Sequence, residues 1–214
     1  MNTSTIKNHS GLNALLRSAK ISLVAGALCL TATPAVFAEA DLSQVPAGAY
    51  SVDPTHAYIQ FQYNHLGLSN PILTFDEFTI DMNLDNADPA KTSVAVGITV
   101  DSVQTGSKIW HQHLTGKDWL DSKGNPEITF KSTSVEGSGS SFKVTGDLTV
   151  KGQTKPVTLD VTINAATNHP MSNKPVVGIS AEGQLLRSDW GLGKNAPFVS
   201  DEITLKIEAE MLQG

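Results

Sequence analysis

The fold is decided by two stretches of sequence, Phe78-Thr79-Ile80-Asp81-Met82-Asn83-Leu84-Asp85 and Ile203-Thr204-Leu205-Lys206-Ile207-Glu208-Ala209-Glu210. In both stretches every apolar residue is followed by a polar one. Because successive side chains of a strand point to opposite faces, this period of two predicts strands with one buried face and one exposed face. An amphipathic helix would instead repeat its apolar residues at intervals of three and four.

The same alternation recurs along most of the chain. It is clear or recognisable in residues 57–65, 94–100, 128–130, 142–150, 157–163 and 177–185. Turn-forming sequences separate several of these runs, such as those at 85–89, 136–139 and 151–153. Together with the two opening stretches, they predict about eight antiparallel strands.

One segment breaks the pattern. Residues 107–120 are too many for a tight turn, and they carry Ile109, Trp110, His113, Leu114 and Leu120 at roughly helical intervals. We expect a short helix here that covers one end of the sheet.

Eight antiparallel strands fit either a sandwich or a closed barrel, and closure removes the exposed edges that make long strands prone to aggregation. We therefore predict an all-β, eight-stranded antiparallel barrel, which encloses enough space for side chains or for one small ligand. An outer-membrane barrel is the main architectural alternative. Aromatic residues make up only 6% of the chain, too few for two interfacial girdles, and this favours the non-membrane barrel.

The N-terminal segment, residues 1–38, has the three parts of a secretory signal. Cations stand at Lys7, Arg17 and Lys20, an apolar run covers residues 21–30, and small residues end at Ala38. Cleavage after Ala40 fits nearly as well as cleavage after Ala38. The apolar run is about ten residues, short of the roughly 20 that a membrane-spanning helix needs, so we expect no membrane anchor. The sole cysteine, Cys29, would be removed with the signal.

The remaining residues 39–214 are predicted to form a single exported domain. Removing residues 1–38 takes away three of the 15 basic residues and none of the 21 acidic ones, which moves the net charge from −6 to −9. Such a surface repels phosphate backbones and therefore argues against nucleic-acid binding. The oligomeric state is open, and a homodimer is one alternative.

A series of short motifs resembles the YceI-like family of periplasmic, lipocalin-like proteins. The series opens with Tyr50-Ser51-Val52-Asp53-Pro54-Thr55-His56, then Phe61 and His65-Leu66-Gly67-Leu68-Ser69. It continues in the family's order through Phe75 and Phe78, and then through the segments 113–120, 126–130, 146–150, 154–159 and 187–192. The resemblance covers nearly all of residues 39–214.

The resemblance implies an extended barrel around a long apolar pore that binds a polyisoprenoid or another long-chain lipid. It implies a periplasmic location and no catalytic activity or cofactor common to the family. The chain departs from the family at Trp110 and His111, where an Arg-Asp pair is frequent, and at Leu73, where a glycine is common near Phe75. These positions lie near the expected mouth, so the identity of the ligand is left open.

A long apolar ligand needs a continuous inward-facing apolar wall, because buried apolar area supplies the driving free energy. The alternative for each wall residue is ordinary core packing. Polar and aromatic side chains near the mouth complete the candidate site. The candidate ligand-binding residues are Ile59, Phe61, Tyr63, His65, Phe75, Phe78, Ile98, Trp110, His113, Trp119, Leu148, Arg187 and Trp190.

Arg187 has two interpretations. It is expected to pair with Asp189 along one strand face, and the alternative is contact with the polar head of a ligand. Trp119 and Trp190 are large enough to line the mouth, and the alternative for each is a plug in the core.

A metal-dependent enzyme or a metal-binding stress protein that uses His111 and His113 is the alternative function. A His-x-His pair on a strand presents both imidazoles to one face, but on a helix the two side chains diverge by about 200° and cannot chelate one ion. Because we expect a helix here, we predict no metal site. The chain contains no nucleophile motif, phosphate loop or zinc-protease signature, and we predict a binding protein and not an enzyme.

Overall fold

The computed structural model describes residues 40–214, so the predicted signal lies outside the described residues. The strands are β1 (Gly48–His65), β2 (Ile72–Phe75), β3 (Phe78–Leu84), β4 (Ser93–Thr99), β5 (Val103–Gln104), β6 (Glu127–Ser138), β7 (Ser141–Val150), β8 (Gln153–Asn168), β9 (Pro175–Leu186) and β10 (Val199–Gln213). One α-helix, α1 (Lys108–Leu114), and the short 3-10 helices η1 (Leu42–Gln44), η2 (Pro89–Lys91), η3 (Val100–Ser102) and η4 (Arg187–Trp190) complete the described part.

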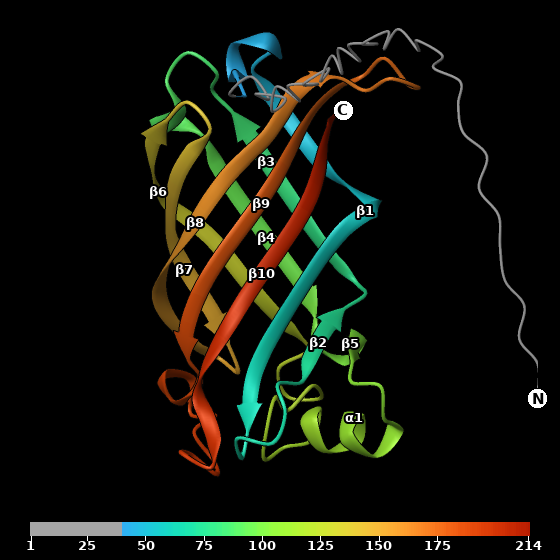
Figure 1. Ribbon diagram of the computed structural model, residues 1–214, viewed down its shortest axis with the longest axis vertical. Helices are drawn as coiled ribbons and strands as arrows, with labels where there is room; N and C mark the ends of the chain where they lie inside the picture. The colour runs from blue at the N-terminus through green and yellow to red at the C-terminus, as the bar shows by residue number, and fades with distance from the viewer. Residues whose placement is uncertain (1–39) are drawn as a thin grey trace, which may run out of the picture. The chain divides into compact units, whose positions relative to one another are not determined.

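Eight strands close into an antiparallel barrel (Figure 1). Their order around the ring is β10-β9-β8-β7-β6-β4-β3-β1, and pairing of β1 with β10 closes it. The short strands β2 and β5 extend the sheet from the lower half of β1, where Ile59 pairs with Phe75. The predicted fold class is confirmed, including the short helix within residues 107–120.

The barrel is built mainly from neighbours in sequence. The β7–β8 connection is a two-residue turn in which Lys151 and Gly152 both have positive φ, of 48° and 72°. This backbone twist matches that of the flanking strands, which is why such turns prefer glycine at the second position. Among the pairings of residues 40–214, the β1–β10 pairing joins the residues farthest apart in the chain, and it is the step that removes the barrel's edges.

The apolar side chains of the alternating runs point inward. On β3, Ile80, Met82 and Leu84 are buried, whereas Thr79, Asp81 and Asn83 are exposed. A membrane barrel would carry its apolar side chains on the outside. In residues 40–214, no helix combines the length and the apolar character needed to cross a membrane.

The two ends of the barrel differ. The end away from α1 is covered by η1, whose Leu42 is buried together with Val45 (Figure 1). The side-chain amide of Asn86 donates to the carbonyl of Val45 at 2.7 Å and ties this cover to the end of β3. At the opposite end, α1, the end of β1 and the connection between β9 and β10 come together (Figure 1).

Candidate ligand-binding site

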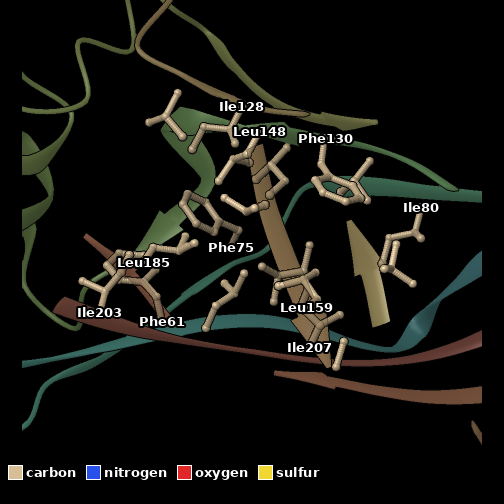
Figure 2. A pocket seen from close by; sticks show the side chains of 18 of the residues that line it. Phe61, Phe75, Ile80, Ile128, Phe130, Leu148, Leu159, Leu185, Ile203 and Ile207 are labelled. Atoms are coloured by element: carbon tan, nitrogen blue, oxygen red, sulfur yellow. The ribbon is translucent and has the colours of Figure 1, made fainter. Parts of the chain in front are cut away.

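The barrel encloses a cavity of about 660 Å³ that runs along its interior (Figure 2). It is lined almost entirely by apolar side chains from all eight barrel strands, among them Phe61, Phe130, Leu159 and Ile207. The volume falls within the range of small-molecule sites, and its apolar wall has the composition such sites need. The space that the alternation predicts is therefore open and is not plugged by side chains.

Few polar side chains line the cavity. They are His65, Thr92, Arg187 and Asn195, and Tyr63, Trp110, Trp119 and Trp190 line the cavity as large aromatic residues with one polar group each. Of the residues that line it, only His65 and Asn195 are exposed to solvent, and both lie at the end of the barrel that carries α1. We therefore place the mouth of the cavity at this end.

Arg187 is the most unusual of these polar residues. Its side chain is 8% exposed, and its Nε donates to the carbonyl of Ser200 at 2.8 Å. Its Nη2 donates to the carbonyl of Val199 at 2.8 Å, and its Nη1 donates to the carbonyls of Leu192 and Lys194. Burial lowers the pKa of the guanidinium from its ordinary value.

The expected pair of Arg187 with Asp189 is wrong. The segment 187–190 is the 3-10 helix η4 and not a strand, so the two side chains do not share a strand face. Among residues 40–214, none of the ion pairs includes Arg187, and its hydrogen bonds go to backbone carbonyls. Its positive charge therefore stands beside the cavity without a carboxylate in contact.

Aromatic side chains surround Arg187 at the mouth. The guanidinium carbon lies 5.8 Å from the ring centroid of Trp119, within the range of a cation–π contact. Trp119 packs edge-to-face against Trp110, with 5.9 Å between ring centroids. Burial raises the pKa of Tyr63, an effect that its hydrogen bond with Trp110 opposes. A polar ligand head would thus meet one cation, one hydroxyl and large rigid rings.

The segment from α1 to β6 positions these aromatic side chains. The hydroxyl of Ser107 accepts from the backbone N–H of Trp110 and caps the helix. Because Trp110 and Leu114 are four residues apart, both face the cavity. Lys194 and Asp118 form an ion pair at 2.9 Å that joins the segment after α1 to the β9–β10 connection.

Trp190 packs in the core of the barrel. Its side chain is 3% exposed, and its indole nitrogen donates to the carbonyl of Leu148 at 3.2 Å. It still contributes to the cavity wall. Trp190 therefore both fills part of the core and lines the cavity.

The structure brings most of the candidate residues to one wall. Eleven of the thirteen line the cavity, and their contact with a ligand stays a prediction; they are Ile59, Phe61, Tyr63, His65, Phe75, Ile98, Trp110, Trp119, Leu148, Arg187 and Trp190. Residues that sequence reasoning did not choose also line it, including Ile80, Phe130, Leu159 and Ile207. The same period-two alternation marks them, so the missed signal was present in the sequence.

Phe78 and His113 are not among the residues that line the cavity. Phe78 is the first residue of β3, directly after the break that separates β2 from β3, and it packs against the core cluster. His113 is exposed on α1, whereas Leu114 beside it is buried and lines the cavity.

The His111 and His113 alternative gains no support from the geometry. His111 Nε2 lies 2.9 Å from the carbonyl of Asp101, and since a carbonyl only accepts, this nitrogen carries a proton. The group of metal-capable side chains found within residues 40–214 contains neither of these histidines.

Fold and site together define a lipocalin-like barrel with an internal apolar cavity and a single polar mouth. Residues 50–211 match the YceI-like domain, and the chain belongs to this family. A curated relative, a UPF0312 protein of Serratia proteamaculans, is 32% identical over 198 residues, which cover 92% of this chain and 97% of the relative.

Solved structures agree with this assignment. BcnA of Burkholderia cenocepacia superposes with a TM-score of 0.67 at 27% identity, covering 76% of this chain and 99% of BcnA. A polyisoprenoid-binding domain of Saccharophagus degradans, implicated in plant cell wall breakdown, superposes with a TM-score of 0.57 at 11% identity, covering 79% of this chain and all of that domain. The second likeness shows a shared fold.

Proposed function

We propose that this chain is a periplasmic carrier that holds the tail of a polyisoprenoid or related long-chain lipid inside the barrel. The main support for this proposal is the continuous apolar cavity, which is open at one end and covered by η1 at the other. Burial of a hydrocarbon tail there gains roughly 25 cal/mol per Å² of apolar surface and needs few polar contacts. The solved neighbour described as a polyisoprenoid-binding domain supports the same class of ligand.

The polar end of the lipid lies at the mouth, near His65 and Arg187. A lipid that enters tail first leaves its head between these two side chains, where the wall ceases to be apolar. The proposed role is binding and not catalysis, since the cavity wall offers a hydrocarbon-like surface with few groups for proton transfer. Export by the signal in residues 1–38 is part of the proposal.

The proposal is tested by filling the cavity. Ala181 is buried on β9 and lines the cavity, so Ala181→Trp projects an indole into the space that the tail would occupy. Ala95→Trp is the matched control, because Ala95 is exposed on β4 between the inward-facing Val94 and Val96. Circular dichroism and thermal unfolding verify that both variants fold.

Binding is measured with a phenylnaphthylamine fluorophore and by its displacement with a polyprenol. The wild type and Ala95→Trp should bind alike, whereas Ala181→Trp should bind at least about tenfold more weakly, a loss of about 1.4 kcal/mol. Equal binding by the two folded variants would reject the interior as the site. Fluorophore binding that a polyprenol does not displace would reject the proposed ligand class.

A further inference from the structure

A second cluster of functional side chains lies on the outside of the barrel, where β1 and β10 lose their regular register. Val52 pairs with Met211, and the next pair is Ala57 with Ala209. Four residues of β1 therefore face a single residue of β10, Glu210. The bulge changes the direction of β1 (Figure 1) and turns Asp53 and His56 toward Glu210.

The contacts within the bulge hold Asp53 in place. Its Oδ1 accepts from the backbone N–H of Thr55 at 2.8 Å and from the Thr55 hydroxyl at 2.7 Å. Its Oδ2 lies 3.1 Å from Nδ1 of His56. One ligand atom from each of Asp53, His56 and Glu210 lies within 4.8 Å of the others.

We propose that Asp53, His56 and Glu210 bind a divalent transition-metal ion of the zinc class on the outer face of the barrel. Zinc is bound by histidine nitrogen and carboxylate oxygen at about 2.0 to 2.2 Å. In the metal-free protein Nδ1 of His56 donates its proton to Oδ2 of Asp53 at 3.1 Å; zinc would displace this proton and take both atoms as ligands. Glu210 completes the set by a change of rotamer, since its side chain is only partly buried.

The types of donor atom in the cluster indicate which class of ion it would bind. A mixed set of one imidazole and two carboxylates favours zinc and its neighbours in the transition series over calcium or magnesium, which prefer oxygen alone.

A groove beside the cluster leaves room for further ligands. It is lined by His56, Glu210, Glu208 and His169, with Asn164 nearby. Nδ1 of His169 accepts from the backbone N–H groups of Met171 and Ser172, and His169 is not one of the three residues whose ligand atoms lie within 4.8 Å of one another. We therefore count three protein ligands, and water would complete the coordination. Three protein ligands plus water is the arrangement of an open site.

The test is calorimetric titration of the untagged, chelator-stripped full chain with zinc sulfate. We expect one zinc ion per chain. His56→Ala, Asp53→Asn and Glu210→Gln should each weaken binding by at least about tenfold. His169→Ala and Glu208→Gln, in the same groove, should leave the affinity within about twofold. A crystal grown with zinc should show anomalous scattering between the three side chains.

Other outcomes overturn the proposal. Unchanged zinc affinity in His56→Ala and Glu210→Gln would remove the site, as would loss of binding only in a His111→Ala, His113→Ala double variant. Tighter binding of calcium than of zinc would reject the assigned class of ion. If His56→Ala fails to fold, Glu210→Gln decides, because it keeps the size of the side chain. Fluorophore uptake into the cavity should be the same with and without zinc, so this test is separate from that of the lipid proposal.

Discussion

At the residue scale, Arg187 does the most to organise the mouth. Its guanidinium joins the carbonyls of Leu192, Lys194, Val199 and Ser200, and so fixes the connection that ends at β10. Four of its five donors are used in this way, which leaves one N–H and the full positive charge for a ligand. The same residue therefore serves stability and, in our proposal, recognition of the lipid head.

We predict that Arg187→Gln lowers the free energy of unfolding by about 3 kcal/mol, because it leaves buried carbonyls without their charged donor. Urea titration followed by tryptophan fluorescence measures the loss. Lys206→Gln is the control, since Lys206 and its partner Glu182 are both exposed, and such pairs contribute less than about 1 kcal/mol. Equal losses of unfolding free energy in the two variants would show that the hydrogen bonds of Arg187 do not stabilise the fold.

The stability of the folded protein should depend on pH through Asp53. Because the pKa of Asp53 is lowered from 3.8 to about 2 in the folded protein, its contribution to stability is present above the unfolded value. It is lost as the pH falls from about 4 to about 2. The difference in urea midpoint between the wild type and Asp53→Asn should be constant above this window and shrink within it. A difference that stays constant throughout the acid range would contradict the hydrogen-bonded carboxylate.

Sequence reasoning was least accurate for single side chains. The alternation placed Phe78 in the wall, but a strand break two residues earlier moved it into the core packing. Arg187 and Asp189 looked like strand neighbours because nothing local reveals that residues 187–190 form a 3-10 turn. The meeting of Asp53 and His56 with Glu210 was also invisible, since it depends on a bulge between the first and last strands.

At the element scale, the strands were predictable because each buries one face. Period-two alternation located all eight barrel strands, and helical spacing located α1. The alternation did not reveal the short strands β2 and β5, which are only four and two residues long. Their positions are set by pairing with β1 and with each other, and not by their own sequences.

Glycine allows the close packing of β6 against β7. A methyl group on Gly146 would overlap the ring of Phe130 and the carbonyl of Lys131, beside the bulge between Ser132 and Ser134. We therefore predict that Gly146→Ala lowers the free energy of unfolding by about 1 to 3 kcal/mol. Gly178→Ala is the control, because the nearest atom to a methyl group there is 3.7 Å away. Thermal unfolding compares the stability of the two variants. A Gly146→Ala variant as stable as the wild type would show that β6 and β7 are less tightly packed at this position.

At the scale of the whole molecule, closure was predictable from the need to cover edges, but the cavity was not. The same alternation produces either a filled core or an open lumen, and the outcome depends on how side chains of different sizes meet across the barrel. The location of the mouth also depends on the assembled structure, because His65 ends β1 and Asn195 lies in the β9–β10 connection, far apart in sequence.

The mouth can be tested by blocking it. In a Cys29→Ser background, Asn195→Cys coupled to a polyethylene glycol maleimide should slow fluorophore uptake severalfold, because the polymer covers the opening. Met171→Cys carries the same label on the β8–β9 connection, at the other end of the barrel (Figure 1), where Met171 is 88% exposed. Equal rates for the two labelled proteins would show that ligands enter elsewhere.

Lipid in the barrel is measured most directly by native mass spectrometry of the protein purified, without detergent, from its own host. We expect one long-chain lipid per chain in the wild type and in Ala95→Trp, and a bare chain for Ala181→Trp. A bare mass for all three proteins, in preparations that also fail to take up a polyprenol, would contradict a lipid-carrying barrel.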